Sequence, residues 1–275
     1  MFDHHPGLSP GIQPPFDLEM PAGAQTAWEL IAGAIMIYTL YYFVQRIRIE
    51  KSAFPAFFWL GTLVLMFAEP LFDVAMTCYY PHEGMNGTFE LWGRIMPLFL
   101  VFCYVGGIAR VMYGVALVIE EGVQPSFIWK AFAIMGVGTA IYEVITINLG
   151  LWTYYSPVHP IRVLNYPLGI GIPNGAAFLL SALAVVKLRP LIEAESKPWL
   201  ATLILPIVFV MGEFAVGWPY FSAINTEAGI DNPLIGIAGL ATTLIFALAL
   251  VWWVTLVGTQ RSSAQRAGKT EAAVA

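Results

Sequence analysis

Charged residues are scarce in this sequence. They make up 11% of the 275 residues, whereas soluble globular domains carry about a quarter. Lysine and arginine together number 13 and form no dense basic patch, so we expect no nucleic-acid partner. The net charge of −5 says little about a chain this apolar, because the placement of the charges matters more than their sum.

Side chains that cofactor sites need are also rare. There are four histidines, too few for a histidine-rich di-iron centre, and residues 233–257 contain no lysine for a retinal Schiff base. No phosphate-binding or dinucleotide-binding glycine motif is present. We therefore expect no cofactor and no metal, and carboxylates joined by His82 or His159 remain the alternative for a metal site. The two cysteines, Cys78 and Cys103, are expected to be unpaired, one in a loop and one in a helix.

Long apolar blocks dominate what is present. Hydrophobic residues make up 58% of the chain, in solid blocks near the length of about 20 helical residues that crosses a bilayer. Backbone groups in lipid must bond internally, as they do in helices. We predict an all-α polytopic membrane bundle of seven transmembrane helices. The expected spans are 25–45, 53–73, 95–118, 127–150, 167–187, 198–219 and 233–257, between an irregular extracytoplasmic segment (1–24) and a disordered cytoplasmic tail (258–275).

The basic residues predict the orientation of these spans. With seven spans, ten of the thirteen fall on one side, and only Arg94 and Arg162 fall on the other. Basic loops face the cytoplasm, so the N-terminus is expected outside and the C-terminus inside, in the inner cell membrane. The ten residues are Arg46, Arg48, Lys51, Lys130, Lys187, Arg189, Lys197, Arg261, Arg266 and Lys269.

Acidic residues inside the spans are the candidate catalytic groups, because charges in a bilayer are costly and usually functional. Glu69, Asp73, Glu143 and Glu213 are expected to be catalytic. At about 1.5 Å of rise per residue, the three glutamates lie roughly 22–24 Å from the cytoplasmic edge. Asn174 reaches a similar level, so these groups can line one pocket in the outer third of the membrane. Poor solvation and mutual proximity there favour the protonated form of a carboxyl group, which suits acid and base catalysis.

An aromatic, proline-rich segment between the fourth and fifth spans is expected to cover this pocket. Together with two span residues it supplies the expected substrate-binding groups, which are Trp152, Tyr154, Tyr155, His159, Asn174 and Arg110. Arg110 is expected to pair with one of the buried acids or to extend towards the cytoplasmic side. The alternatives are an interfacial aromatic belt for the loop and helix-packing hydrogen bonds for the acids.

The stretch from Glu143 to Asn174 resembles the AveC-like spirocyclase family of bacterial membrane proteins. The resemblance rests on Glu143, on LGLWTYYSPVHP (149–160), on the Tyr166-Pro167 pair and on Asn174, with a similar run, PLFLVFCYVGGIARVMYG, at 97–114. It spans about residues 55–190. It implies an enzyme that closes a spiroketal, or performs a related cyclisation or dehydration, and it brings no assigned catalytic residues.

Three functions remain open at this point. The first is cofactor-independent acid/base cyclisation, of spiroketal type, or dehydration of an apolar polyketide- or lipid-like substrate that enters from the bilayer. The second is an acid-catalysed isoprenoid or carotenoid cyclase or hydratase. The third is a transporter or accessory protein for small molecules or lipids, although no inverted repeat of the kind found in many transporters is visible. The partners expected are a hydrophobic small molecule and membrane lipid, and the oligomeric state stays open.

Overall fold

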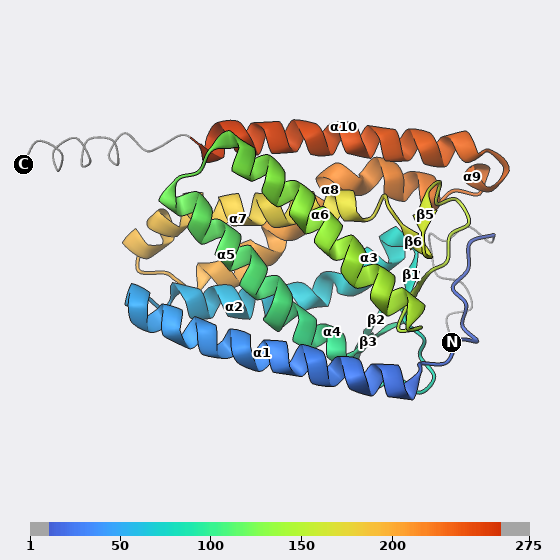
Figure 1. The fold of residues 1–275 in the computed structure, drawn as a ribbon, viewed down its shortest axis with the longest axis horizontal. Coiled ribbons are helices and arrows are strands. Elements are labelled where there is room, and N and C mark those ends of the chain that lie inside the picture. Colours follow the sequence, from blue (N-terminus) through green and yellow to red (C-terminus); the bar gives the residue numbers. More distant parts are fainter. Residues whose placement is uncertain (1–10, 260–275) are drawn as a thin grey trace, which may run out of the picture.

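Seven long apolar helical spans form the protein in the computed structural model, which describes residues 11–259 (Figure 1). The predicted number of spans and the all-α class are confirmed. The spans are α1 (Ala22–Glu50), α2 to α3 (Phe54–Met76), α4 to α5 (Leu98–Glu121), α6 (Pro125–Asn148), α7 (Gly171–Ala194), α8 (Leu200–Ile224) and α10 (Pro233–Gly258). Residues 11–21 contain no helix, and most of the predicted tail lies outside the described residues.

The second and third spans are interrupted in their middle. The second passes from α2 (Phe54–Leu65) through a 3₁₀ turn, η1 (Met66–Ala68), into α3 (Glu69–Met76). Pro70 lies in the first turn of α3, where it forfeits no helical hydrogen bond. The third passes from α4 (Leu98–Cys103) through a π-helical segment, η2 (Tyr104–Ile108), into α5 (Ala109–Glu121). Such segments rotate the side chains that follow them and often occur at functional sites.

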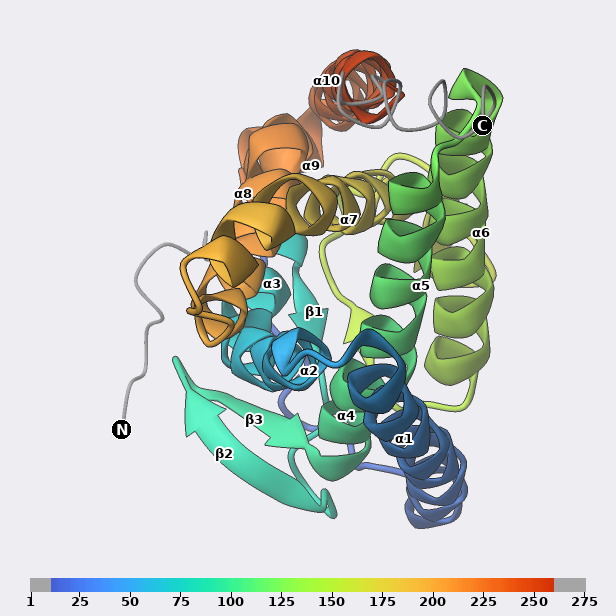
Figure 2. The same cartoon turned by 90° about the vertical axis from the view of Figure 1, so that its left-hand side faces the viewer.

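Close helix packing holds the spans together. Helix α8 packs against α2, α7 and α10, α6 packs against α7, and α1 packs against α4 and η2. Figure 2 shows α10 and α8 on one side of the bundle, and α1 on the other with the hairpin of β2 (Gly87–Leu91) and β3 (Arg94–Pro97). At Gly212 in α8, an added Cβ would lie 3.0 Å from the Ala177 Cα of α7. Small residues allow this approach, as is common between membrane helices.

Three short antiparallel strand pairs and a one-turn helix, α9 (Ala228–Asp231), lie at one end of the bundle (Figure 1). Strand β1 (Cys78–Tyr79) pairs with β4 (Thr153–Tyr154), and so joins the segments that follow the second and fourth spans. Strand β2 (Gly87–Leu91) pairs with β3 (Arg94–Pro97), and β5 (Arg162–Val163) with β6 (Tyr166–Pro167). The sequence predicted only loops here, because strands of two to five residues carry too little periodicity to recognise.

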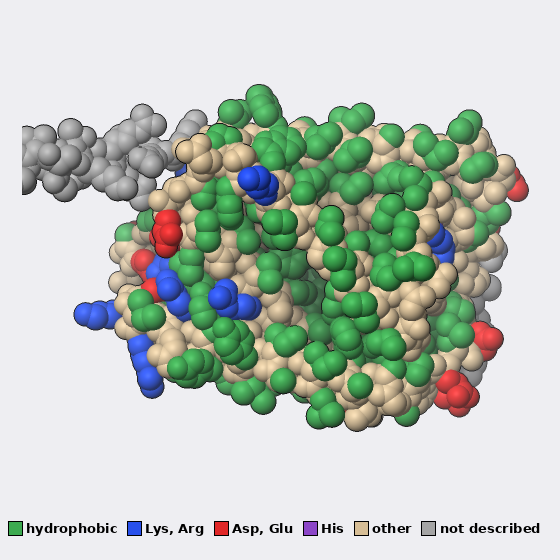
Figure 3. Space-filling view, viewed as in Figure 1, with side chains coloured by type: hydrophobic (Ala, Val, Ile, Leu, Met, Phe, Trp, Pro, Cys, Tyr) green, Lys and Arg blue, Asp and Glu red, His purple; other side chains and the backbone are tan. Residues whose placement is uncertain are grey.

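The opposite end contains a buried ionic cluster. The Glu50 carboxylate accepts hydrogen bonds from Arg46 (2.6 Å), from Arg189 (2.5 Å) and from the Tyr113 hydroxyl (2.7 Å). Its side chain is 8% exposed, and that of Arg189 is 10% exposed. The cluster links α1, α5 and α7. In Figure 3 most of the visible lysine and arginine side chains lie towards this end of the molecule.

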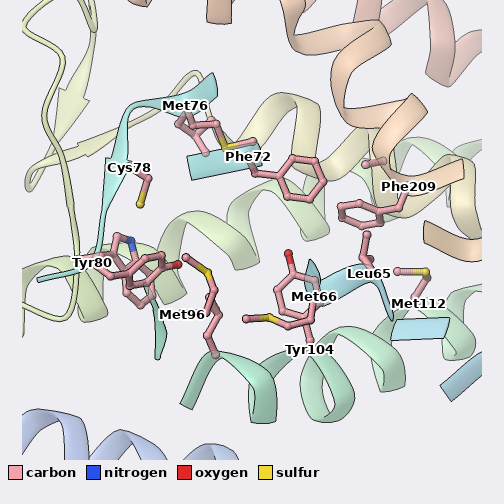
Figure 4. Close-up of a cluster of buried hydrophobic side chains, with 14 of the residues drawn as sticks. Leu65, Met66, Phe72, Met76, Cys78, Tyr80, Met96, Tyr104, Met112 and Phe209 are labelled. Carbon is pink, nitrogen blue, oxygen red and sulfur yellow. The ribbon is translucent and has the colours of Figure 1, made fainter. Parts of the chain in front are cut away.

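The main buried cluster lies between this ionic end and the end with the strand pairs. Aromatic, methionine and aliphatic side chains from several elements meet there, and Figure 4 shows part of it. The residues labelled in that view are Leu65, Met66, Phe72, Met76, Cys78, Tyr80, Met96, Tyr104, Met112 and Phe209. Six of them, Phe72, Met76, Cys78, Tyr80, Tyr104 and Phe209, also line a cavity.

Candidate functional site

A cavity of about 510 Å³ lies inside the bundle, between the first six spans and the end with the strand pairs. This volume falls within the range of about 300–1,000 Å³ that is typical of ligand sites. Its wall is mainly apolar, with few polar groups. The polar and ionisable lining side chains are Glu69, Asp73, Cys78, Tyr80, Cys103, Tyr104, Thr139, Tyr142, Glu143, Tyr154 and Asn174, with the indoles of Trp28 and Trp152.

Glu69 begins α3 and projects into this cavity. The 3₁₀ turn before it ends one helical segment and starts the next, which sets the direction of the Glu69 side chain. The hydroxyl of Tyr80 donates to one carboxylate oxygen at 3.1 Å, and the hydroxyl of Tyr104 donates to the other. Tyr104 belongs to the π-helical segment. The two irregular segments therefore bring this acid and its donor together.

Glu143 enters the cavity from α6 and is 7% exposed. One of its carboxylate oxygens accepts hydrogen bonds from the Tyr154 hydroxyl at 2.6 Å and from the Trp152 indole at 3.3 Å. Both donors belong to the aromatic segment after α6. Two of the six predicted substrate-binding residues thus line the cavity and hold this acid.

Asp73 lies one helical turn after Glu69 on the same face of α3, as the spacing of four predicted. It is 2% exposed, and its Oδ2 has no hydrogen-bond partner among the described residues. The nearby positive charge of Arg94 interacts with its carboxylate. A free acceptor oxygen on the cavity wall can accept a hydrogen bond from a ligand.

Glu213 and Asn174 form a contact beside the cavity. With its amide oriented to satisfy both groups, Asn174 donates to the two carboxylate oxygens of Glu213 at 2.9 and 3.2 Å. This contact agrees with the common depth predicted for these two residues. Asn174 lines the cavity, whereas Glu213 is fully buried behind it. Of the four predicted acids, Glu69, Asp73 and Glu143 therefore reach the cavity wall.

Arg110 lies apart from the acids. Its guanidinium carbon is 3.9 Å from the centre of the Tyr42 ring, a cation–π contact between α5 and α1. No carboxylate lies within ion-pair distance of Arg110 among residues 11–259. The sequence could not predict this, because the direction of the Arg110 side chain depends on the π-helical segment η2, which directly precedes α5.

His159 also lies off the cavity. Its ring nitrogens contact the Thr77 hydroxyl at 3.1 Å and the Tyr220 hydroxyl at 2.7 Å, which ties the aromatic segment to α8. Burial, reinforced by the charge of Arg162, lowers the pKa of His159 to about 3. The ring is therefore neutral at ordinary pH, and both nitrogens are engaged. This position suits a role in folding the aromatic segment.

Arg94 is buried, whereas the sequence indicated only that it lies in an outer loop with few basic residues. Its side chain is fully buried between the rings of Tyr79 and Tyr155, and it donates to the Tyr155 hydroxyl at 3.0 Å. Burial raises the pKa of Tyr155 to about 12 although Arg94 opposes the shift, so this tyrosine stays neutral. Tyr155 contacts Arg94 and does not line the cavity.

Tyrosines within the spans are the other residues that the sequence analysis missed. Tyr104 and Tyr142 both line the cavity, and Tyr142 contacts the Cys103 thiol at 3.3 Å. A hydroxyl in an apolar span needs a partner, and this requirement could have singled them out. Both cysteines are free, as expected.

The metal alternative receives no geometric support. Among the described residues, no three histidine, cysteine or acidic side chains are grouped as metal ligands. His82 accepts a hydrogen bond from the Ile95 amide at 3.3 Å. Neither His82 nor His159 lines the cavity that holds the acids.

Comparison with protein-family models, with curated proteins and with solved structures finds no match for this chain. The evidence for the function of the site is its own geometry. That geometry is a mainly apolar cavity with three carboxyl groups from two spans on its wall, and two of these groups are held by aromatic hydrogen-bond donors.

Proposed function

We propose that this protein is a membrane enzyme that cyclises or dehydrates an apolar polyketide- or lipid-like substrate by acid and base catalysis. The observation that carries the proposal is the meeting of Glu69 and Asp73 from α3 with Glu143 from α6 at one apolar cavity. Groups for proton transfer are useful where they converge on a space that a substrate can fill. The resemblance of residues 55–190 to the AveC-like spirocyclase family points to the same chemistry.

The reaction needs one proton donor and one proton acceptor. A carboxyl group can donate when protonated and accept when ionised. One carboxyl protonates a substrate hydroxyl, which leaves its carbon as water. A second substrate hydroxyl then forms a bond to that carbon. The other carboxyl takes the proton of the attacking hydroxyl. The substrate loses one water overall, and no electron is transferred. One carboxyl has lost a proton and the other has gained one, so a proton transfer between them restores the enzyme.

The aromatic donors position the acids in this scheme. Tyr154 and Trp152 share one oxygen of Glu143, which leaves its other oxygen for the substrate. Tyr80 and Tyr104 engage both oxygens of Glu69. The free Oδ2 of Asp73 and the amide of Asn174 can orient substrate hydroxyls. Glu143 is therefore the first residue to test.

Replacing Glu143 with glutamine should abolish turnover and leave the folded yield nearly unchanged, because glutamine retains an acceptor oxygen for Tyr154 and Trp152. The exposed Glu121 offers a control: Glu121→Gln removes the same charge away from the cavity and should keep full activity. The measurement compares bilayer-soluble metabolites from cells that lack the chain with those from cells that express each variant. Full activity of Glu143→Gln would remove this residue from the mechanism.

The mass difference between accumulated precursor and product separates the candidate functions. Spiroketal closure or dehydration makes the product lighter than the precursor by one water. An isoprenoid cyclase would give an isomer of unchanged mass, and a hydratase would give a heavier product. A transporter would change only where the compound is found. Any of these last three results would contradict the proposal.

A further inference from the structure

The cavity reaches the flank of the bundle. Four of its aliphatic lining residues are also exposed at the surface: Ile31 (49%) and Ile35 (45%) of α1, Val111 (47%) of α5 and Ile134 (70%) of α6. Figure 3 shows a hollow on this face, in the region where Figure 1 draws α5 and α6. These four side chains therefore form the rim of an opening.

Two glycines keep the opening free. Gly107 of η2 and Gly138 of α6 line the cavity, and a Cβ added to either would meet no atom within 4 Å. The neighbouring Gly106 differs, because its added Cβ would lie 3.1 Å from the Met36 backbone of α1. Gly106 therefore serves helix packing, whereas Gly107 and Gly138 border empty space.

The rim is apolar and lies along membrane-spanning helices. The four exposed rim residues are aliphatic, and they belong to the first, third and fourth spans. In a bilayer such a surface faces hydrocarbon and not water. Near the catalytic acids, Trp28 of α1 donates to the Tyr142 hydroxyl of α6 at 3.4 Å, with ring centres 5.6 Å apart. This pair bridges α1 and α6 at one edge of the opening.

We propose that this opening is a lateral portal through which the hydrocarbon part of a bilayer-dissolved substrate reaches the cavity acids. The proposal rests on the proposed function for the reaction and adds the class of substrate, a membrane-soluble molecule with an apolar chain or ring system. Gly107 and Gly138 determine how wide a group can pass. The Trp28–Tyr142 pair marks the side of the portal nearest Glu143.

Photolabelling tests the portal without knowledge of the natural substrate. The full chain is placed in phosphatidylcholine vesicles that contain a phospholipid with a diazirine in its acyl chain. After illumination, the labelled residues are mapped by mass spectrometry. We expect label on Tyr104 and Phe209, which line the cavity, as well as on the exposed Ile141 of α6. The variant Gly138→Trp should lose the two inner labels and keep the label on Ile141.

Two control variants separate blockage from misfolding. Gly138→Ala adds a methyl group to empty space, and Val137→Trp adds the same indole at an exposed neighbour that does not line the cavity. Both should keep the inner labels. Gly107→Trp is a second blocking variant on another helix and should lose them.

Inner labelling that survives both Gly138→Trp and Gly107→Trp in folded protein would overturn the portal. The absence of inner labels in the unaltered protein would overturn it too. The labelling does not need turnover, so Glu143→Gln should label like the unaltered protein. Turnover by Glu143→Gln would contradict the proposed catalysis and leave the portal standing. Labelling of Tyr104 and Phe209 in both tryptophan variants would contradict the portal and leave the proposed catalysis standing.

Discussion

Replacing Glu50 with glutamine should destabilise the protein strongly, because Glu50 neutralises a buried ionic cluster between three spans. Its carboxylate contacts Arg46 and Arg189 at 2.5 Å each and accepts a hydrogen bond from Tyr113. Glutamine would remove the negative charge and leave the two arginines facing each other. The only carboxylates left near Arg189 would be those of Glu193, at 3.3 Å, and of Glu120 on α5, at 3.8 Å.

The size of the effect follows from burial. Removing one partner of a buried ion pair typically costs about 3–5 kcal/mol. The remaining contact with Glu193 compensates part of the charge of Arg189, so we expect the lower end of that range, about 3 kcal/mol. The free energy of unfolding would be measured by titrating mixed detergent micelles with a denaturing detergent and following helix content by circular dichroism.

Glu120→Gln is the matched control for this prediction. Glu120 lies 3.8 Å from Arg189, but its side chain is 42% exposed. Exposed ion pairs contribute about 0–1 kcal/mol, so the same chemical change should have little effect. The double variant Glu50→Gln/Arg189→Met should recover much of the loss, because it removes the uncompensated charge. Equal costs for Glu50→Gln and Glu120→Gln would refute the argument.

Two further predictions concern the aromatic segment and the helix packing. The pKa of His159 is about 3 in the folded protein and near 6.5 in the unfolded chain. Between pH 6.5 and pH 3 the unfolded chain therefore binds a proton that the folded protein does not, and acid destabilises the fold. Because of this group, the free energy of unfolding should fall by about 2 kcal/mol between pH 7.5 and pH 5. The variant His159→Asn should lose that part of the pH dependence. The same pH profile of stability in the variant would contradict a buried neutral ring. Gly212→Val should cost about 1–3 kcal/mol through overpacking against Ala177, whereas Gly23→Val, where an added Cβ meets no neighbour, should be nearly neutral in the same unfolding assay.

The positions of the spans followed from the sequence because a membrane makes span formation a local property. An apolar block must satisfy its own backbone hydrogen bonds, whatever its neighbours are. The expected span 233–257 and the observed Pro233–Gly258 differ by one residue. Depth is local as well, since it depends only on the rise per residue. For this reason Asn174 and Glu213 could be placed at one level before their contact was known.

Only the tertiary structure decided which way each polar side chain points. The 3₁₀ and π-helical interruptions rotate Glu69 and Tyr104 towards each other and send Arg110 to Tyr42. Such rotations arise from packing between spans that are distant in the sequence, so no pattern within one span encodes them. The same is true of His159, whose partners come from segments on either side of it in the chain. The sequence determined which helices cross the membrane and at what depth their acids lie, and the packing of those helices decided which acids share a cavity.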